Sequence, residues 1–134
     1  MSRFTIKNLM DVEDSAGERV AGLEGRFARK HLDSEHLGVS YFHYSPGLRS
    51  PMAHSHREQE EAYIVVGGSG RIRLDDEVYP LRRWDVVRVA PATVRAFEAS
   101  EDGLEIIAVG SDRPEGGDGV RAPSAWIDEL EEAQ

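Results

Sequence analysis

The chain has 134 residues, 40% of them hydrophobic and 31% charged, which is typical of a single globular domain with its own core. Its formal net charge of −9 argues against a nucleic-acid partner, because phosphate binding needs a basic face. Cysteine is absent, which excludes disulfides and thiolate chemistry and leaves nitrogen and oxygen to hold any metal. No apolar run is long enough to span a bilayer and no secretory signal is visible, so we expect a cytoplasmic protein without membrane contact.

The first third of the chain contains three segments with strand character. Residues 4–7 alternate polar and apolar side chains like a short strand, and an acidic loop follows at residues 11–18. Residues 26–32 lie between a glycine and an Asp-Ser pair, which predicts a second strand or a sheet edge. Residues 37–44 are rich in β-branched and aromatic side chains and end at a Ser-Pro-Gly turn, so they form the clearest strand of the three.

The next stretch, residues 54–70, combines features of a metal site. His54 and His56 are two apart, and a strand places such residues on the same face, so both imidazoles can point to one place. Glu61 then opens an apolar run with strand character, which the glycines of residues 67–70 are expected to end. Two histidines and a carboxylate from the following strand make a face of two nitrogens and one oxygen for a divalent metal.

The remaining segments also alternate and are short. Residues 71–74 and 78–81 form a predicted hairpin around an acidic turn, and three further strands are expected at residues 86–89, 94–98 and 104–109. Many short strands without a convincing helix between them favour an antiparallel barrel or sandwich. A Gly- and Pro-rich loop follows at residues 111–121, and Ser124 is expected to cap a closing helix that carries Trp126 and Leu130.

The histidine stretch resembles the first motif of the cupin superfamily. That motif consists of a glycine, His-x-His, a glutamate a few residues later and a second glycine. Gly47, His54, His56, Glu61 and Gly68 occupy these positions, with one residue more than usual between the first glycine and the first histidine.

The register of the glutamate has an alternative. Glu60 together with Gly67 matches the shorter spacing of the motif equally well. Glu61 is preferred, because this choice places residues 68–70 at the turn that the family usually makes.

The second cupin motif is degenerate in this chain. Its two glycines correspond to Trp84 and Ala92, its asparagine falls near Ala99, and its histidine is replaced by Arg95. Arginine stays protonated and offers no lone pair, so Arg95 cannot take the place of an imidazole ligand. The second motif therefore supports the fold more than the chemistry.

The resemblance implies an all-β protein, a cupin-like antiparallel double-sheet β-barrel of the jelly-roll type with a short C-terminal helix. Residues 1–134 would form one cupin domain, with the barrel core at about residues 37–110, N-terminal strands within residues 1–36, and the loop and helix in residues 111–134. Cupins commonly form dimers, and the alternating N-terminal strand offers an edge for a second chain. A homodimer is thus expected.

The resemblance also implies the site. His54, His56 and Glu61 would bind a divalent metal, with Mn, Fe, Ni and Zn not distinguished by these ligands. Arg95 has two open roles. It either orients an anionic ligand that bridges to the metal, or it pairs with Glu61, competes with the metal and leaves a polar pocket without one. Tyr63 has the strand parity of Glu61 and Phe97 that of Arg95, so both are candidates for the pocket lining, with core packing as the other role of Tyr63. His43 has the strand parity of Tyr41 and Val39 and is a candidate to face the barrel lumen as a substitute ligand, with a hydrogen-bonded core histidine as its other role.

Two functions from different classes remain open at this point. One is a metal-dependent enzyme in which Arg95 orients a small anionic substrate and the metal acts as a Lewis acid or redox centre. The other is a metal-free or vestigial cupin that binds a small polar or anionic molecule without turnover. No second acid–base residue stands out in the sequence, so the catalytic residues and the reaction stay unassigned.

Overall fold

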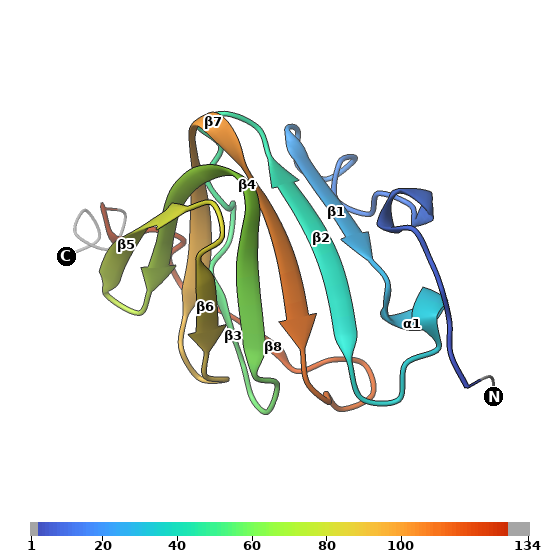
Figure 1. Cartoon of the computed structure of the whole chain (residues 1–134). Helices are drawn as coiled ribbons and strands as arrows, with labels where there is room; N and C mark the ends of the chain where they lie inside the picture. Colours follow the sequence, from blue (N-terminus) through green and yellow to red (C-terminus); the bar gives the residue numbers. More distant parts are fainter. Residues whose placement is uncertain (1–2, 129–134) are drawn as a thin grey trace.

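The computed structural model describes residues 3–128 and shows an all-β jelly-roll barrel built from one curled antiparallel sheet (Figure 1). Two short helical segments precede the barrel core, the 3₁₀ helix η1 (Leu9–Asp11) and α1 (Arg29–Leu32). The strands are β1 (Leu23–Phe27), β2 (Gly38–Tyr44), β3 (His54–His56), β4 (Glu61–Leu74), β5 (Glu77–Arg82), β6 (Val86–Val89), β7 (Arg95–Gly110) and β8 (Gly119–Arg121).

The long strand β7 organises the sheet. Its C-terminal half lies between β2 and the start of β4, and β2 in turn pairs with the edge strand β1. The N-terminal half of β7 pairs with the far end of β4, and Arg95 at its first position is the register partner of His54 in β3. Strand β3 also pairs with β8, so the C-terminal segment lies directly beside the two histidines.

Glycines bend β4 and β7 but do not end them. The prediction that residues 67–70 terminate a strand is wrong, because β4 continues to Leu74, with register shifts against β7 at Val65/Gly67 and Gly68/Gly70. A Cβ at Gly68 would lie 2.0 Å from the Gly103 carbonyl oxygen, and Gly68 has a φ of 66°. The glycines therefore allow close crossing at β-bulges. For the same reason the two strands expected at residues 94–98 and 104–109 form one continuous strand, β7, with Gly103 inside it.

The N-terminal strand predictions are only partly confirmed. Residues 4–7 are not a strand, because no segment among the described residues forms a β-ladder with them, and Ile6 is 88% exposed. The segment predicted at residues 26–32 is divided: β1 ends at Phe27 and a helical turn follows, closed by Asp33 with a left-handed φ of 54°. Alternation of polar and apolar residues therefore does not by itself predict a strand, because a strand also needs a neighbouring strand to pair with.

The core fills the space between the two curved faces of the sheet. Inward residues of β4 and β7 supply most of it, including Val65, Ile72, Leu104 and Ile106. A smaller cluster forms where the C-terminal segment returns to the barrel around the buried Trp126, whose indole Nε1 donates a hydrogen bond to the backbone.

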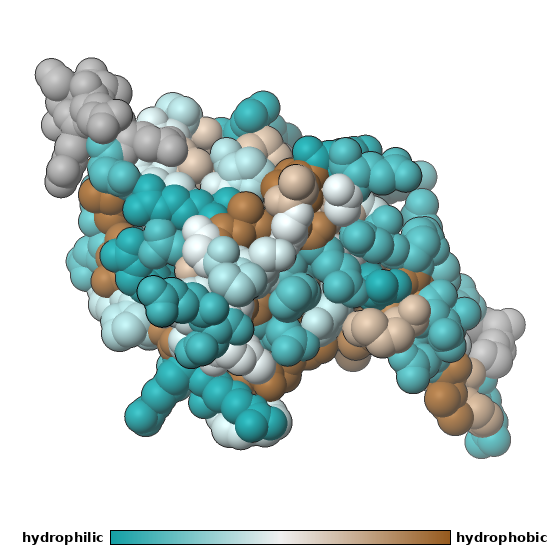
Figure 2. Space-filling model, turned by 90° about the horizontal axis from the view of Figure 1, so that it is seen from above, coloured by the Kyte–Doolittle hydropathy of each residue, from teal (hydrophilic) through white to brown (hydrophobic). Residues whose placement is uncertain are grey.

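The C-terminal helix is described only at its start. Helical structure begins only at Ile127 and includes Asp128, so the prediction that Ser124 caps a helix carrying Trp126 is wrong: residues 124–126 are not helical. The predicted continuation of the helix through Leu130 lies outside the described residues. The face seen in Figure 2 is mostly hydrophilic, with separate small apolar patches. Within residues 3–128, no helix is long and apolar enough to cross a membrane. The predicted homodimer and cytoplasmic location stay predictions.

Candidate metal centre

The barrel encloses a cavity of about 370 Å³ that opens on one side. Strand alternation brings alternate side chains of β2, β4 and β7 to its wall, among them Phe42, Tyr44, Tyr63 and Phe97. Most of the wall is apolar, but one part of it is formed by a polar group of four residues: His54, His56, Glu61 and Arg95. The cavity lies in the size range of small-molecule sites.

His43 does not line this cavity, contrary to the expectation from its parity. The neighbouring residues Phe42 and Tyr44 point into the cavity, so His43 lies on the opposite face of β2, opposite Glu24 and Glu105 in the adjacent strands. The alternation along this strand was predicted correctly, but the even-numbered residues face the cavity and not the odd-numbered residues that include His43. Tyr63 and Phe97, by contrast, line the cavity, and their rings pack edge to face with centroids 4.9 Å apart.

The structure brings His54, His56 and Glu61 together. One nitrogen from each imidazole and one Glu61 oxygen all lie within 4.8 Å of one another, and all three residues are partly buried. The two histidine rings are nearly perpendicular, with centroids 5.0 Å apart. Glu60 points elsewhere and pairs with the exposed Arg88 at 2.8 Å, so Glu61 is the glutamate of the cluster.

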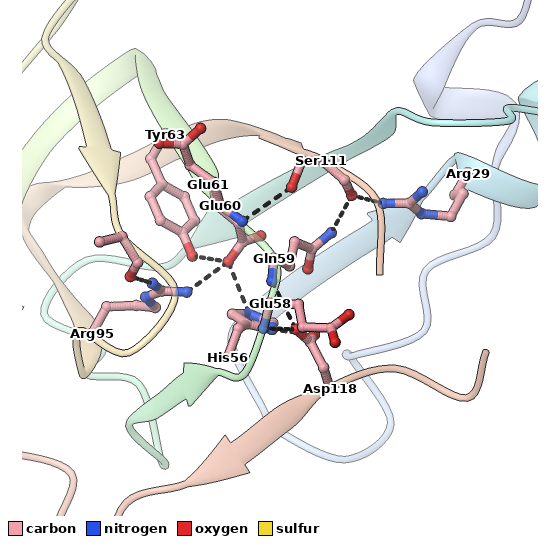
Figure 3. A network of polar contacts seen from close by, with 11 residues as sticks. Arg29, His56, Glu58, Gln59, Glu60, Glu61, Tyr63, Arg95, Ser111 and Asp118 are labelled. Carbon is pink, nitrogen blue, oxygen red and sulfur yellow. Dashed lines mark hydrogen bonds and ion pairs between the residues drawn. The ribbon is translucent and has the colours of Figure 1, made fainter. Parts of the chain in front are cut away.

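Arg95 closes the cluster from β7. Its side chain has no exposed surface, and its Nη1 donates to Glu61 Oε1 at 2.9 Å, while Nη2 donates to the Ala90 carbonyl at 2.8 Å (Figure 3). The Tyr63 hydroxyl donates to the same Glu61 oxygen at 2.6 Å. Of the two roles open for Arg95, the structure shows the ion pair with Glu61. That oxygen is therefore held by a cation and a hydroxyl at once.

Burial and charge set the protonation of the two histidines differently. Burial, reinforced by the positive charges of His56 and Arg95, lowers the pKa of His54 to about 4, so its ring is neutral near pH 7. The nearby Glu61 carboxylate raises the pKa of His56 although burial opposes it, and Asp118 adds to the increase. Burial would raise the pKa of Glu61, but His56, Tyr63 and Arg95 outweigh it and lower that pKa.

Asp118 is a site residue that the sequence analysis did not identify. Its buried carboxylate lies 2.8 Å from His56 Nδ1 through Oδ1, and Oδ2 accepts the backbone N–H groups of Glu58 and Gln59 (Figure 3). These bonds outweigh burial and lower the pKa of Asp118 to about 2. It lies in the Gly-rich loop just before β8, where no local pattern distinguishes it. Only the pairing of β8 with β3 brings it to the histidines.

The residues fit a divalent metal. His56 Nε2 is buried without a hydrogen-bond partner and lies 3.0 Å from Glu61 Oε1, without the alignment of a hydrogen bond. When Nε2 carries no proton, two lone-pair atoms at this distance repel one another unless a metal cation neutralises them. His54 makes no side-chain hydrogen bond to a described residue, so its neutral ring also has a free lone pair. Two imidazoles and a carboxylate are ligands typical of Zn, Fe, Mn or Ni sites.

Fold and site together define a β-barrel protein with a polar cluster of metal-ligand type inside the barrel. Residues 40–110 match the family model described as the cupin domain, which is more than half of the chain. The chain belongs to the cupin family. No curated protein matches the sequence.

Solved structures resemble most of the chain rather than the motif alone. A cupin protein from Bacteroides fragilis is 22% identical with a TM-score of 0.69, the match covering 86% of this chain and 89% of that one. KdgF from Halomonas sp. is 19% identical with a TM-score of 0.67, covering 87% and 98%. A sugar phosphate isomerase from Silicibacter pomeroyi is 16% identical with a TM-score of 0.70, covering 91% and 96%. At these identities the likeness establishes the fold alone.

Proposed function

We propose that this cupin binds a divalent metal through His54, His56 and Glu61 and holds a small anionic molecule in the cavity beside it. The observation that carries the proposal is the buried His56 Nε2, which has no hydrogen-bond partner and faces Glu61 Oε1 at 3.0 Å. A buried nitrogen without a hydrogen-bond partner costs free energy unless a metal ion or a proton binds to it and to the carboxylate.

The charges around the cavity favour an anion. Three arginines line it, Arg29, Arg95 and Arg113, against the single carboxylate of Glu61, in a protein whose net charge is −9. When both histidines are neutral, Arg95 and Glu61 neutralise one another and the negative charge of Asp118 remains. A bound divalent cation would give these three residues and the metal a total charge of +1, which an anionic ligand neutralises.

The apolar wall restricts the ligand further. Phe42, Met52 and Phe97 line the cavity together with several other apolar side chains, so the body of the ligand contacts hydrocarbon while its charged end contacts the cluster. We therefore propose a small carboxylate with an apolar portion, oriented by Arg95 and the more exposed arginines. When bound, the metal would supply Lewis-acid or redox chemistry. The reaction is left unassigned.

The Arg95–Glu61 ion pair supports a second candidate, a binding module that needs no metal. A proton on His56 provides the same charge neutralisation between His56 Nε2 and Glu61, and Arg95 already donates a hydrogen bond to one oxygen of the carboxylate. In this case the cavity binds its ligand through arginines and apolar contacts alone. The two candidates differ in whether a metal ion or a proton lies at the cluster. In both, the ligand is a small anion with an apolar portion.

Metal content separates the two candidates. The protein is purified without a histidine tag, and metal per chain is measured by elemental analysis before and after incubation with Mn²⁺, Fe²⁺, Ni²⁺ and Zn²⁺. We expect near-stoichiometric metal that His54→Ala and Glu61→Ala both abolish. The matched control is His36→Ala, which removes an exposed histidine outside the cluster. Wild-type protein that refuses all four ions would refute the metal site and favour the metal-free binding module.

A further inference from the structure

The loop between β7 and β8 contributes one buried carboxylate to the site. Asp118 is 4% exposed and directly precedes β8, whose residues pair with His54, Ser55 and His56 of β3. The backbone N–H of Arg57 also donates to the Asp118 carbonyl at 3.1 Å. The C-terminal segment is thereby attached to both ends of the histidine motif.

The two carboxylate oxygens of Asp118 have separate partners. Oδ2 accepts the N–H groups of Glu58 and Gln59 at 2.7 and 2.8 Å, and Oδ1 lies 2.8 Å from His56 Nδ1. An ionised carboxylate only accepts hydrogen bonds, so Nδ1 of His56 has to carry the proton. In a neutral imidazole the lone pair then lies on Nε2, the nitrogen beside Glu61.

We infer that Asp118 is a positioning residue for the metal site, because it holds His56 in the tautomer that presents the Nε2 lone pair to the cavity. The same carboxylate fixes the turn that connects the histidines to Glu61, through its bonds to two successive backbone amides. One residue thus sets both the orientation of a ligand ring and the spacing to the next ligand. Carboxylates behind ligand histidines generally raise metal affinity in this way. The inference rests on the proposed function.

The test is Asp118→Asn, which preserves size and shape. The amide oxygen can still accept from Glu58 and Gln59, and this places the amide NH₂ against His56 Nδ1. The NH₂ group is a donor, so it forces the neutral ring into the other tautomer, with the proton on Nε2. We expect the affinity for Zn²⁺, measured by competition with a chromophoric chelator, to fall about 10- to 100-fold.

A second readout does not need the metal. Two-bond ¹H–¹⁵N correlation spectra of the metal-free protein at mildly alkaline pH report which His56 nitrogen carries the proton. We expect the Nδ1–H tautomer in the wild type and the Nε2–H tautomer in Asp118→Asn. The matched control is Asp14→Asn, since Asp14 Oδ1 accepts three backbone N–H groups in a loop that does not contact the cluster. This control is expected to change neither affinity nor tautomer.

The outcomes separate this inference from the metal proposal. Loss of affinity with an unchanged tautomer would overturn the inference and assign Asp118 a purely structural role in the turn. An unchanged affinity and tautomer would overturn it as well. A wild type that binds no Zn²⁺ but changes tautomer on substitution would refute the metal site while confirming that Asp118 fixes His56.

Discussion

Strands β3 and β7 meet at the cluster with opposite chemistry, although His54 and Arg95 are register partners across them. Strand β3 supplies two imidazoles that can accept a cation, and β7 supplies a buried guanidinium that is itself a permanent cation. Glu61 lies between them and interacts with both. In the proposed metal site, the affinity of the histidine side would therefore depend on how strongly the arginine side holds the shared carboxylate.

Removing the shared carboxylate should have the largest effect. Glu61→Gln leaves the fully buried Arg95 without a counter-ion, and breaking a buried pair in this way costs about 3–5 kcal/mol. Urea unfolding at neutral pH measures the loss. Glu60→Gln, at the exposed neighbouring position, should change stability by less than about 0.5 kcal/mol. Equal losses in the two variants would show that Arg95 does not depend on Glu61.

The buried His54 should make the stability of the metal-free protein depend on pH. The folded pKa of His54 is about 4 against an unfolded value of about 6.5, so the unfolded chain binds more protons between these values. Stability is therefore complete above pH 6.5 and is lost as the pH falls toward 4, by about 3 kcal/mol for this group. His54→Gln should flatten the profile in this window. An unchanged profile would place a solvated, not a buried, imidazole at this position.

Changing the arginine side should raise metal affinity. Arg95→His removes the competing cation and restores the nitrogen donor of the second cupin motif, so the dissociation constant should fall by roughly tenfold or more, which is about 1.4 kcal/mol. Calorimetric titration with Zn²⁺ or Ni²⁺ measures it. Arg88→His, which adds a histidine on the exposed side of β6, serves as the control. If the Arg95 variant bound metal no better than the wild type, the ion pair would not be what limits affinity.

The degenerate second motif predicts a smaller effect on stability. Trp84 occupies the position of the motif glycine and has a φ of 76°, a backbone conformation that costs a non-glycine residue about 1–2 kcal/mol. Trp84 is 65% exposed and its ring contacts the guanidinium of Arg83, so Trp84→Gly should stabilise the protein by about 0.5 kcal/mol after the greater chain entropy of glycine is included. Thermal unfolding beside Trp84→Ala, which keeps the Cβ, tests this. Equal effects of both variants would argue against backbone strain.

Local patterns in the sequence determined most strands between residues 37 and 110, the β4–β5 hairpin and the convergence of His54, His56 and Glu61, although the alternating residues 4–7 are not a strand. Each of these depends on neighbours in the chain, on side-chain parity and on a motif of fixed spacing. Tertiary structure decided the rest. The glycines of β4 mark bulges because β7 crosses there, and His43 faces outward because the opposite side of β2 forms the cavity.

The contacts of Arg95 and Asp118 show the same limit most clearly. The sequence shows that arginine replaces the motif histidine. Whether Arg95 pairs with a ligand or with Glu61 depends on the packing of two strands, because Glu61 lies 34 residues away in the chain. Asp118 lies 62 residues from His56 and has no local signal, so only the pairing of β8 with β3 placed it behind the ring. The proposed metal-binding residues follow from spacing along the chain. Their protonation and partners depend on long-range packing, which sets the distances between charges.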